Sequence, residues 1–333
     1  MTDTAPSTDR ATGADRATGA DHATGADHAT GAHAAGLRIG TAPDSWGVWF
    51  ADDPRQTPWD RFLDEVQAAG YHWIELGPYG YLPTDPAQLR DELAKRDLEI
   101  SGGTVFTGFH KGADQWDRAV EQVEKVAALT RAVGGEHIVV IPDLWRSDVT
   151  GETLEPRTLT DGQWASLAEG HDRLGRMLIE EYGLRQQFHS HADSHIGTHR
   201  EVERLLAETD PRYVNLCLDT GHFAYYGGDS VALIHDHPER IGYLHLKQID
   251  PELRFEILKN DLAFADAAID VMVEPPAGVP DFAPIIEAVA AIDPEIFAIV
   301  EQDMPGIDID VPLGIAARTR QHILGCSPLT RTR

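Results

Sequence analysis

The sequence predicts a (β/α)8 barrel, also called a TIM barrel, an α/β fold in which a helix follows each of eight parallel strands. Short β-rich runs alternate with longer amphipathic stretches across residues 37–326, and this alternation is typical of right-handed βαβ units. Eight such units in about 290 residues match this barrel in number and size. A doubly wound open sheet is the alternative, but no Gly-x-Gly-x-x-Gly motif follows the first strand.

The expected elements follow one another in strand–helix order. We expect strands at residues 37–41, 72–76, 100–106, 137–141, 184–189, 213–218, 241–246 and 297–300. We expect helices between them, with the clearest at 60–69, 86–95, 116–133, 164–182, 200–207 and 282–291. Gly70, Gly134 and Gly183 stand where a helix is expected to end, because glycine adopts the left-handed conformation of a C-cap at no steric cost.

Residues 1–36 differ from the rest of the chain. The segment Ala11-Thr-Gly-Ala-Asp-Arg16 recurs with a six-residue period, and no large apolar residue follows Met1 in this region. Such a segment cannot bury enough surface to offset the entropy of ordering. We therefore expect a disordered tail at 1–36, a barrel domain at 37–326 and a short C-terminal tail at 327–333.

Composition limits the classes of partner. The chain has 55 acidic and 28 basic residues and a formal net charge of −27, which argues against nucleic acid or an anionic membrane as partner. A small polyol or keto-sugar remains compatible. Cys217 and Cys326 form no disulfide framework. Because the sequence has neither an apolar run of membrane-spanning length nor a secretory signal, we expect a cytoplasmic protein.

Charged and imidazole side chains gather where the expected strands end, which is where barrel enzymes place their chemistry. These residues are Glu75, Asp143, His189, His191, Asp219, His222, His245, Lys247 and Glu301. Taken singly, Asp219 suits a turn or N-cap and Glu301 an ion pair. On successive strands, Asp219, His245 and Glu301 predict a metal site, since buried charges are costly unless paired. Mixed oxygen and nitrogen ligands suit Mn²⁺, Co²⁺, Fe²⁺ or Zn²⁺ better than Mg²⁺.

Several motifs carry a resemblance to a known family. They are Ile39-Gly-Thr-Ala-Pro-Asp-Ser-Trp-Gly47, Gly70-Tyr-His-Trp-Ile-Glu-Leu-Gly-Pro78, His189-Ser-His191, Leu218-Asp-Thr-Gly-His222, His245-Leu-Lys247 and Val300-Glu-Gln-Asp303. Over residues 37–325 the chain resembles the xylose isomerase-like superfamily of sugar isomerases and epimerases. Within that superfamily it is most similar to the inosose dehydratases of inositol catabolism.

The resemblance implies a divalent metal, Mn²⁺ or Co²⁺ above all, held by Asp219, His245 and Glu301. The superfamily usually adds a glutamate at the end of the fifth strand. This chain has His189-Ser-His191 there, so His189, His191 or water is left as the fourth ligand. The chain also departs from the pattern at residues 192–195, which separate His191 from the Gly197-Thr198 pair, and at residues 273–280.

The implied reaction is loss of water from a keto-cyclitol. The metal would stabilise the enediolate that forms when the α-proton leaves, while His191 or His222 would act as base or acid. Lys247, with a lowered pKa beside the cation, would stabilise oxyanion charge. The alternative for Lys247 is an ion pair with Glu75 or Asp219. The alternative for His222 is that it only orients Asp219.

Substrate contacts are expected from Glu75, Asp143 and Trp46. Trp46, with Tyr79 and Phe106, is placed to form an apolar wall for a sugar ring, and core packing is the alternative for each. The resemblance is also compatible with a homo-oligomer.

Other functions use the same fold. An isomerase or 3-epimerase would need a second active-site glutamate, which the fifth strand does not provide. A lyase that cleaves keto-glycosides would use the same enolate chemistry. A nuclease acting at abasic DNA needs a basic groove, which the net charge disfavours. A non-catalytic sugar-binding barrel would have little reason to retain a metal.

Overall fold

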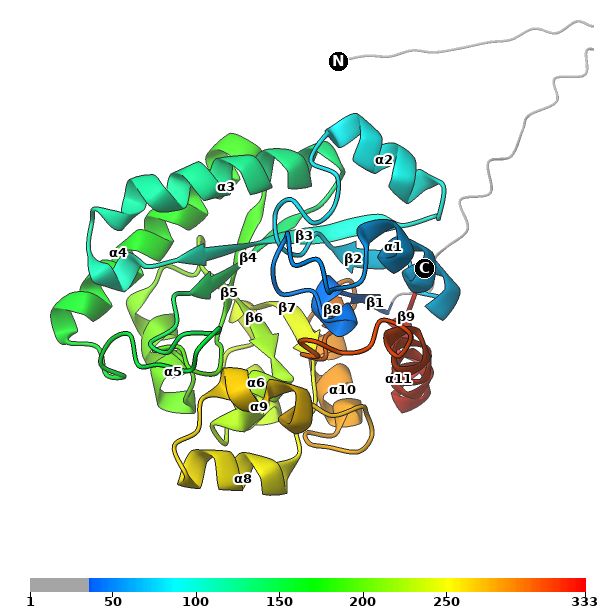
Figure 1. Ribbon diagram of the computed structural model, residues 1–333. Coiled ribbons are helices and arrows are strands. Elements are labelled where there is room, and N and C mark those ends of the chain that lie inside the picture. The colour runs from blue at the N-terminus through cyan, green and yellow to red at the C-terminus, as the bar shows by residue number, and fades with distance from the viewer. Residues whose placement is uncertain (1–35) are drawn as a thin grey trace, which may run out of the picture. The chain divides into compact units, whose positions relative to one another are not determined.

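The computed structural model describes residues 36–333, so the tail predicted at 1–36 falls almost entirely outside the described residues. Eight parallel strands form the barrel (Figure 1). They are β1 (Leu37–Thr41), β2 (Trp73–Glu75), β3 (Glu99–Thr107), β4 (His137–Pro142), β5 (Arg185–His189), β6 (Asn215–Asp219), β7 (Ile241–Leu246) and β8 (Phe297–Val300).

The sheet closes because β1 pairs on both sides. Thr41 is in register with Val300 of β8, and Gly40 is in register with Trp73 of β2. The predicted (β/α)8 barrel is therefore confirmed. Residues 327–333, which the sequence predicts as a tail, lie against the barrel, where β9 (Thr330–Arg331) pairs with the start of β1.

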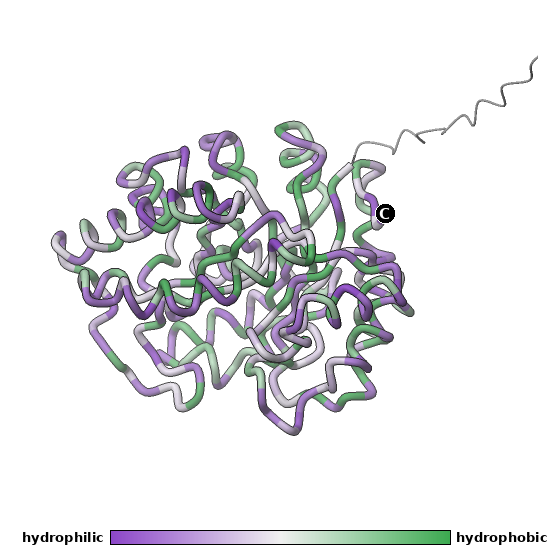
Figure 2. The backbone as a smooth tube through the Cα atoms, turned by 90° about the horizontal axis from the view of Figure 1, so that it is seen from above, coloured by the Kyte–Doolittle hydropathy of each residue, from purple (hydrophilic) through white to green (hydrophobic). Residues whose placement is uncertain are grey.

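Helices surround the barrel, and hydrophobic and hydrophilic residues alternate along them (Figure 2). They are α1 (Trp59–Ala69), α2 (Pro86–Ala94), α3 (Gln115–Ala132), α4 (Asp161–Met177), α5 (His199–Glu208), α6 (Thr220–Tyr225), α7 (Ser230–Asp236), α8 (Pro251–Lys259), α9 (Phe264–Val271), α10 (Phe282–Ile292) and α11 (Pro312–Cys326). The predicted helix 164–182 is α4 followed by a π-helical segment, Leu178–Tyr182. Gly70, Gly134 and Gly183 all have positive φ, as a C-cap requires.

Local sequence explains where several helices begin. Thr160 and Gln163 form a capping box at α4, and Thr198 and Glu201 form another at α5. The short helix α6 starts directly after β6, because Asp219 accepts a hydrogen bond from the backbone N–H of His222. One side chain thus ends a strand, caps a helix and faces the barrel mouth.

The interior of the barrel is packed with apolar and aromatic side chains. One buried cluster joins Ala42, Trp73, Val139, Cys217, Tyr243, Phe297 and Ile299. Cys217 is a small buried core residue with a free thiol. A larger apolar layer lies between the strands and the helices. Among residues 36–333, no helix is long and apolar enough to cross a membrane.

Candidate active site

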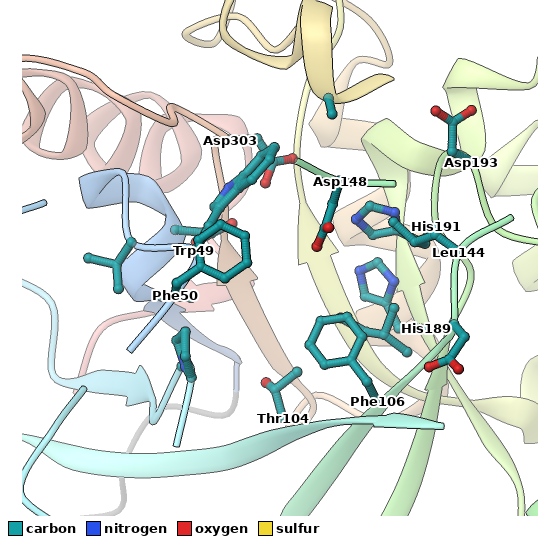
Figure 3. Close-up of a pocket in the computed structure, with 18 of the residues that line it drawn as sticks. Trp49, Phe50, Thr104, Phe106, Leu144, Asp148, His189, His191, Asp193 and Asp303 are labelled. Carbon is teal, nitrogen blue, oxygen red and sulfur yellow. The ribbon is translucent and has the colours of Figure 1, made fainter. Parts of the chain in front are cut away.

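A cavity of about 910 Å³ opens where the barrel strands end. Its lining includes side chains from the ends of β2, β5 and β7, from the start of α6 and from the segment after β8. Figure 3 shows Trp49 and Phe50 on one side of the cavity and His189 and His191 on the other. The predicted site at the mouth of the barrel is therefore a real, concave space.

Four of the predicted residues meet where the strands end, three of them in the cavity lining and Asp219 fully buried beside them. Ligand atoms of His189, Asp219, His245 and Glu301 lie within 4.8 Å of one another. Asp219 Oδ2 lies 3.3 Å from His189 Nε2 and 3.7 Å from His245 Nδ1, and His245 Nδ1 lies 2.8 Å from Glu301 Oε2. The structure thus places the His189 ring next to the three residues that the resemblance implied, at the position left open.

Two buried atoms at the centre of this group make no aligned hydrogen bond within residues 36–333, although charged groups lie beside them: Asp219 Oδ2, 3.3 Å from Lys247 Nζ, and His245 Nδ1, 2.8 Å from Glu301 Oε2. The other polar atom of each side chain is hydrogen-bonded. Asp219 Oδ1 accepts a hydrogen bond from the His222 N–H at 2.7 Å, and His245 Nε2 is hydrogen-bonded to Glu75 Oε1 at 2.8 Å. Unpartnered buried polar atoms are costly, and two imidazoles with two carboxylates are ligands of divalent transition ions. The group fits a divalent cation.

Glu75, predicted as a substrate contact, lines the cavity, but its carboxylate is already engaged. Besides His245, it accepts a hydrogen bond from Thr104 Oγ1 at 3.2 Å, and the residue is 2% exposed. A carboxylate on the outer nitrogen of a histidine fixes its tautomer and its ring. Glu75 therefore orients His245, so that Nδ1 faces the centre of the site.

Lys247 lies among three carboxylates. Its Nζ is 2.9 Å from Asp303 Oδ2, 3.1 Å from Glu301 Oε2 and 3.3 Å from Asp219 Oδ2. Burial lowers the pKa of Lys247, but the surrounding carboxylates outweigh burial and raise it well above its ordinary value. The lowered pKa expected beside a cation therefore stays a prediction, because the raised pKa reflects the surrounding carboxylates alone.

The same ammonium acts on Glu301. Burial raises the pKa of the Glu301 carboxyl, but His245 and Lys247 hold it at about 2. Asp219 follows the same pattern: its pKa lies well below the ordinary value although burial opposes this. Both carboxylates are therefore charged and ready to bind a cation at neutral pH.

The backbone of Ala192 contacts both predicted catalytic histidines. Its carbonyl oxygen is 2.7 Å from His191 Nδ1, and its N–H donates to His222 Nδ1 at 3.1 Å. Because a carbonyl only accepts, His191 carries its proton on Nδ1 and leaves Nε2 as a free base. Because an N–H only donates, the Ala192 contact favours the neutral His222 tautomer with its proton on Nε2; that proton must then face Asp303 Oδ2, because the ammonium of Lys247, 3.2 Å from Nε2, can only donate. The two rings lie 3.8 Å apart between centroids.

Both rings are neutral in this environment. Burial lowers the pKa of His191 to about 3, with the charge of Lys247 contributing, and burial lowers the pKa of His222 well below its ordinary value. His222 Nε2 lies 3.2 Å from Lys247 Nζ and 3.6 Å from Asp303 Oδ2. The orienting alternative also holds for His222, but it acts on Asp219 through the His222 backbone N–H.

Trp46 is not a substrate contact. It is 0% exposed, its Nε1 donates to Glu65 Oε2 at 2.8 Å, and its ring packs edge-on against Phe62. The 3₁₀ helix Pro43–Trp46 and the left-handed Gly47 after it direct Trp46 into the core. Trp49, three residues on, takes the expected place in the cavity wall.

The remaining predicted wall residues reach the cavity. Tyr79 and Phe106 line it and are 40% and 47% exposed. Asp143 also lines it, where Lys111 Nζ lies 2.7 Å from its Oδ2. A substrate hydroxyl that binds Asp143 would therefore also meet the ammonium of Lys111, which is paired with the same carboxylate.

Two acidic residues of the site were not assigned roles from the sequence. Asp303 receives the shortest contact of Lys247, and Asp44 lines the cavity within the field of Glu301. Burial raises the pKa of both. Asp303 lies in the Glu-Gln-Asp motif two residues after Glu301, and that spacing was the available signal.

Comparison with known proteins agrees with this geometry. A family model described as a xylose isomerase-like TIM barrel matches residues 63–321. An inosose dehydratase of Bacillus velezensis is 32% identical over 228 residues, covering 65% of this chain and 72% of that protein. An inosose dehydratase of Lactiplantibacillus plantarum is 29% identical over 270 residues, covering 78% and 88%.

Among solved structures, the IolI protein with a bound zinc atom matches with a TM-score of 0.65 at 14% identity, covering 87% of this chain and 98% of that chain. This likeness shows the fold alone. The family match spans β2 to β8, which carry the four clustered residues. The chain belongs to the xylose isomerase-like TIM barrel family.

Proposed function

We propose that the protein is a metal-dependent hydro-lyase that removes water from inosose, a keto-cyclitol. The relatives named inosose dehydratase support the substrate class. The observation that carries the proposal is the contact of one backbone unit, Ala192, with both rings: its carbonyl fixes the proton of His191 on Nδ1, and its N–H favours a proton on Nε2 of His222. One ring offers a lone pair and its neighbour offers a proton at the same wall of the cavity.

Elimination of water needs both groups at once. A base removes the proton next to the ketone, and an acid protonates the hydroxyl that departs. His191 Nε2 is the base and His222 Nε2–H is the acid in our assignment. A neutral imidazole that gives up its Nε2 proton would become an imidazolate, so the ammonium of Lys247, 3.2 Å from His222 Nε2, replaces that proton as the hydroxyl leaves as water.

The clustered ligands supply the remaining component. A divalent cation held by Asp219, His245, Glu301 and His189 would stabilise negative charge on the ketone oxygen as a Lewis acid; we propose Mn²⁺ or Co²⁺. Lys247 keeps three carboxylates in place around that position. The free thiols of Cys217 and Cys326 are compatible with the predicted cytoplasmic location.

Elimination is favoured over epimerisation by the residue at the end of β5. An epimerase of this superfamily uses two opposed glutamates as acid and base. Here His189 occupies the end of β5 and belongs to the ligand cluster. Glu75, the glutamate at the end of β2, is bound to His245. The proton-transfer groups are imidazoles instead.

Deuterium exchange separates the two roles. Chelator-treated protein is restored with Mn²⁺, Co²⁺ or Zn²⁺ and incubated with scyllo-inosose in D₂O, and the dione product and the deuterium at the α-carbon are followed by NMR. We expect metal-dependent dione formation. His191→Asn should lose exchange and elimination together, whereas His222→Asn should keep exchange and lose about 10²-fold or more of elimination. His199→Asn, on the partly exposed start of α5, is the matched control.

Each outcome decides something. Activity that survives complete removal of metal would overturn the cation site. Metal-dependent exchange without dione, in the wild-type protein, would overturn dehydration in favour of isomerisation or epimerisation. Equal loss of exchange in His191→Asn and His222→Asn would contradict the division between base and acid.

A further inference from the structure

A second cluster of ligand-type side chains lies behind the cavity wall. Atoms of His110, Glu155 and His195 lie within 4.8 Å of one another. His110 follows β3, Glu155 lies between β4 and α4, and His195 lies between β5 and α5. Three separate loops thus converge on one point. His195 belongs to the 192–195 segment by which this chain departs from the family pattern, and none of the three has a role in the proposed reaction.

The two imidazoles are fully buried, and the outer nitrogen of His195 is held by a hydrogen bond. Both histidine side chains are 0% exposed, whereas the Glu155 side chain is 18% exposed. His195 Nδ1 is 2.9 Å from the carbonyl oxygen of Arg157, so that nitrogen carries the proton. His195 Nε2 then presents a lone pair toward Glu155 and, within residues 36–333, has no hydrogen-bond partner. A backbone carbonyl on the outer nitrogen is the usual support of a metal-binding histidine.

His110 is hydrogen-bonded to Glu155, whereas the contact of His195 with Glu155 has the spacing of two ligands of one ion rather than that of a hydrogen bond. His110 Nε2 is 3.1 Å from both oxygens of Glu155, but His195 Nε2 is 3.6 Å from Glu155 Oε1. The second distance is too long for a hydrogen bond. Two ligands bound at about 2.1 Å to one tetrahedral ion are separated by roughly 3.4 Å. Both separations are close to that value.

We propose that His110, Glu155 and His195 bind a divalent transition cation, with Zn²⁺ as the best match. Two imidazoles and a carboxylate leave a fourth position for water. The ion fastens the loop after β4 to the loop after β5, which already contact each other where the Trp145 N–H donates to the Asp193 carbonyl. Leu144 and Leu154, at the two ends of this fastened loop, line the cavity.

One cation already stands near this cluster. Lys111 Nζ lies 3.5 Å from Glu155 Oε1, but it is closer to Asp143 Oδ2, at 2.7 Å. The Lys111 side chain is 36% exposed, so it can stay on Asp143 when an ion occupies the cluster. We therefore expect Lys111→Met to tighten metal binding at this cluster.

Counting bound ions tests the proposal without any assay of activity. The full-length protein is stripped with a chelator, loaded with Zn²⁺ and desalted, and zinc per chain is measured by elemental analysis, with Co²⁺ absorption as a second readout. We expect Glu155→Gln to lose one equivalent and Asp219→Asn to lose a different one, so that the double variant loses two. Glu203→Gln is the matched control, because it breaks an exposed His199–Glu203 pair at 3.4 Å and should lose none.

The proposal is overturned if Glu155→Gln retains the zinc content and the Co²⁺ spectrum of the wild type. It is also overturned if Asp219→Asn alone removes every ion that Glu203→Gln retains, a comparison that does not depend on how the Glu155 variant folds. Circular dichroism confirms that each variant is folded. Failure here leaves the proposed dehydratase untouched, since that rests on the other cluster.

Discussion

The mouth of the barrel and its interior use buried polar groups in opposite ways. In the interior, the Tyr243 hydroxyl donates to Ser101 Oγ at 2.8 Å, Ser101 Oγ donates to the Ile74 carbonyl at 3.0 Å, and the Gln187 amide donates to His137 Nδ1 at 2.9 Å. At the mouth, Asp219 Oδ2 and His245 Nδ1 have no hydrogen bond among the described residues. In the interior the unpartnered atom of this group is the neutral amide oxygen of Gln187, whereas at the mouth the unpartnered atoms are of the kinds that bind metal ions.

This difference shows which region serves stability. Polar groups that find partners inside the barrel add to a single well-ordered core. Charged groups clustered on neighbouring strands repel one another unless a cation or Lys247 lies between them. Functional sites commonly break rules that the rest of the fold obeys. Substitutions at the mouth should therefore change activity more than stability, and substitutions in the interior the reverse.

The largest effect is expected from Asp219→Asn. Loss of a charged ligand removes cation binding, and with the cation goes its stabilisation of the transition state. A loss of about 4 kcal/mol lowers kcat by about 10³-fold. Asn still caps α6, so the fold should remain. Asp250→Asn is the matched control, because Asp250 caps α8 in the same way and does not line the cavity. Near-normal activity of Asp219→Asn would contradict the ligand assignment.

The second largest effect is a loss of folding stability at acidic pH, caused by the buried His137 of the barrel interior. Burial, with Arg38 nearby, lowers the pKa of His137 to about 4 in the folded protein, against about 6.5 when unfolded. The unfolded chain therefore binds a proton first as pH falls. The stability contribution is complete above pH 6.5 and is lost as pH falls to 4, by at most about 1.4 kcal/mol per pH unit.

Urea unfolding at pH 7, 5.5 and 4.5 checks this pH dependence. His137→Gln keeps a neutral polar group in place and should flatten the dependence of the unfolding free energy on pH. An unchanged slope in His137→Gln would show that the burial of His137 does not cause the acid sensitivity. A remaining slope is expected from His171, His191 and His222, because burial lowers the pKa of each of these histidines as well.

Much of this contrast could be predicted from the sequence. The strand–helix alternation gave the barrel because period and length depend on local residue patterns. Asp219, His245 and Glu301 were predicted because parallel strands of one barrel all end at the same face, so residues at strand ends must meet. Gly70 and Gly183 marked helix ends because their left-handed φ is a local requirement.

The rest depends on three-dimensional packing. Trp46 and Trp49 both follow the first strand, and only the turn of the intervening 3₁₀ helix and Gly47 decides which one faces the cavity. The helices α8 and α9 were missed because loops that pack over a barrel mouth follow no fixed period. The contact between Glu75 and His245 joins residues 170 positions apart, and no local pattern reports it.

A smaller effect is expected from Glu75→Gln. The amide keeps the size of the side chain but weakens its hold on His245 Nε2, so metal affinity or activity should fall by about 10- to 100-fold. The measurement is Mn²⁺ affinity by calorimetry together with kcat. Glu121→Gln, a cavity-lining carboxylate that pairs only with exposed Lys125, is the control. An effect as large as that of Asp219→Asn would indicate that Glu75 is itself a ligand.

The smallest effect is expected from Tyr243→Phe in the interior. The substitution removes the hydrogen bond to Ser101 and should lower the free energy of unfolding by about 1 kcal/mol. Ser101 keeps its bond to the Ile74 carbonyl, so no buried donor is abandoned. Activity should stay within about twofold of the wild type, corresponding to under roughly 0.5 kcal/mol. A larger loss of activity than of stability would break the separation between interior and mouth.

The most direct test of the account is an anomalous diffraction map of the protein crystallised with Mn²⁺. The account predicts a peak between Asp219, His245 and Glu301, at about 2.0–2.2 Å from Asp219 Oδ2 and His245 Nδ1, the two atoms that folding leaves without hydrogen bonds. A map in which Mn²⁺ occupies only other positions, with Lys247 still filling the centre of the site, would contradict it.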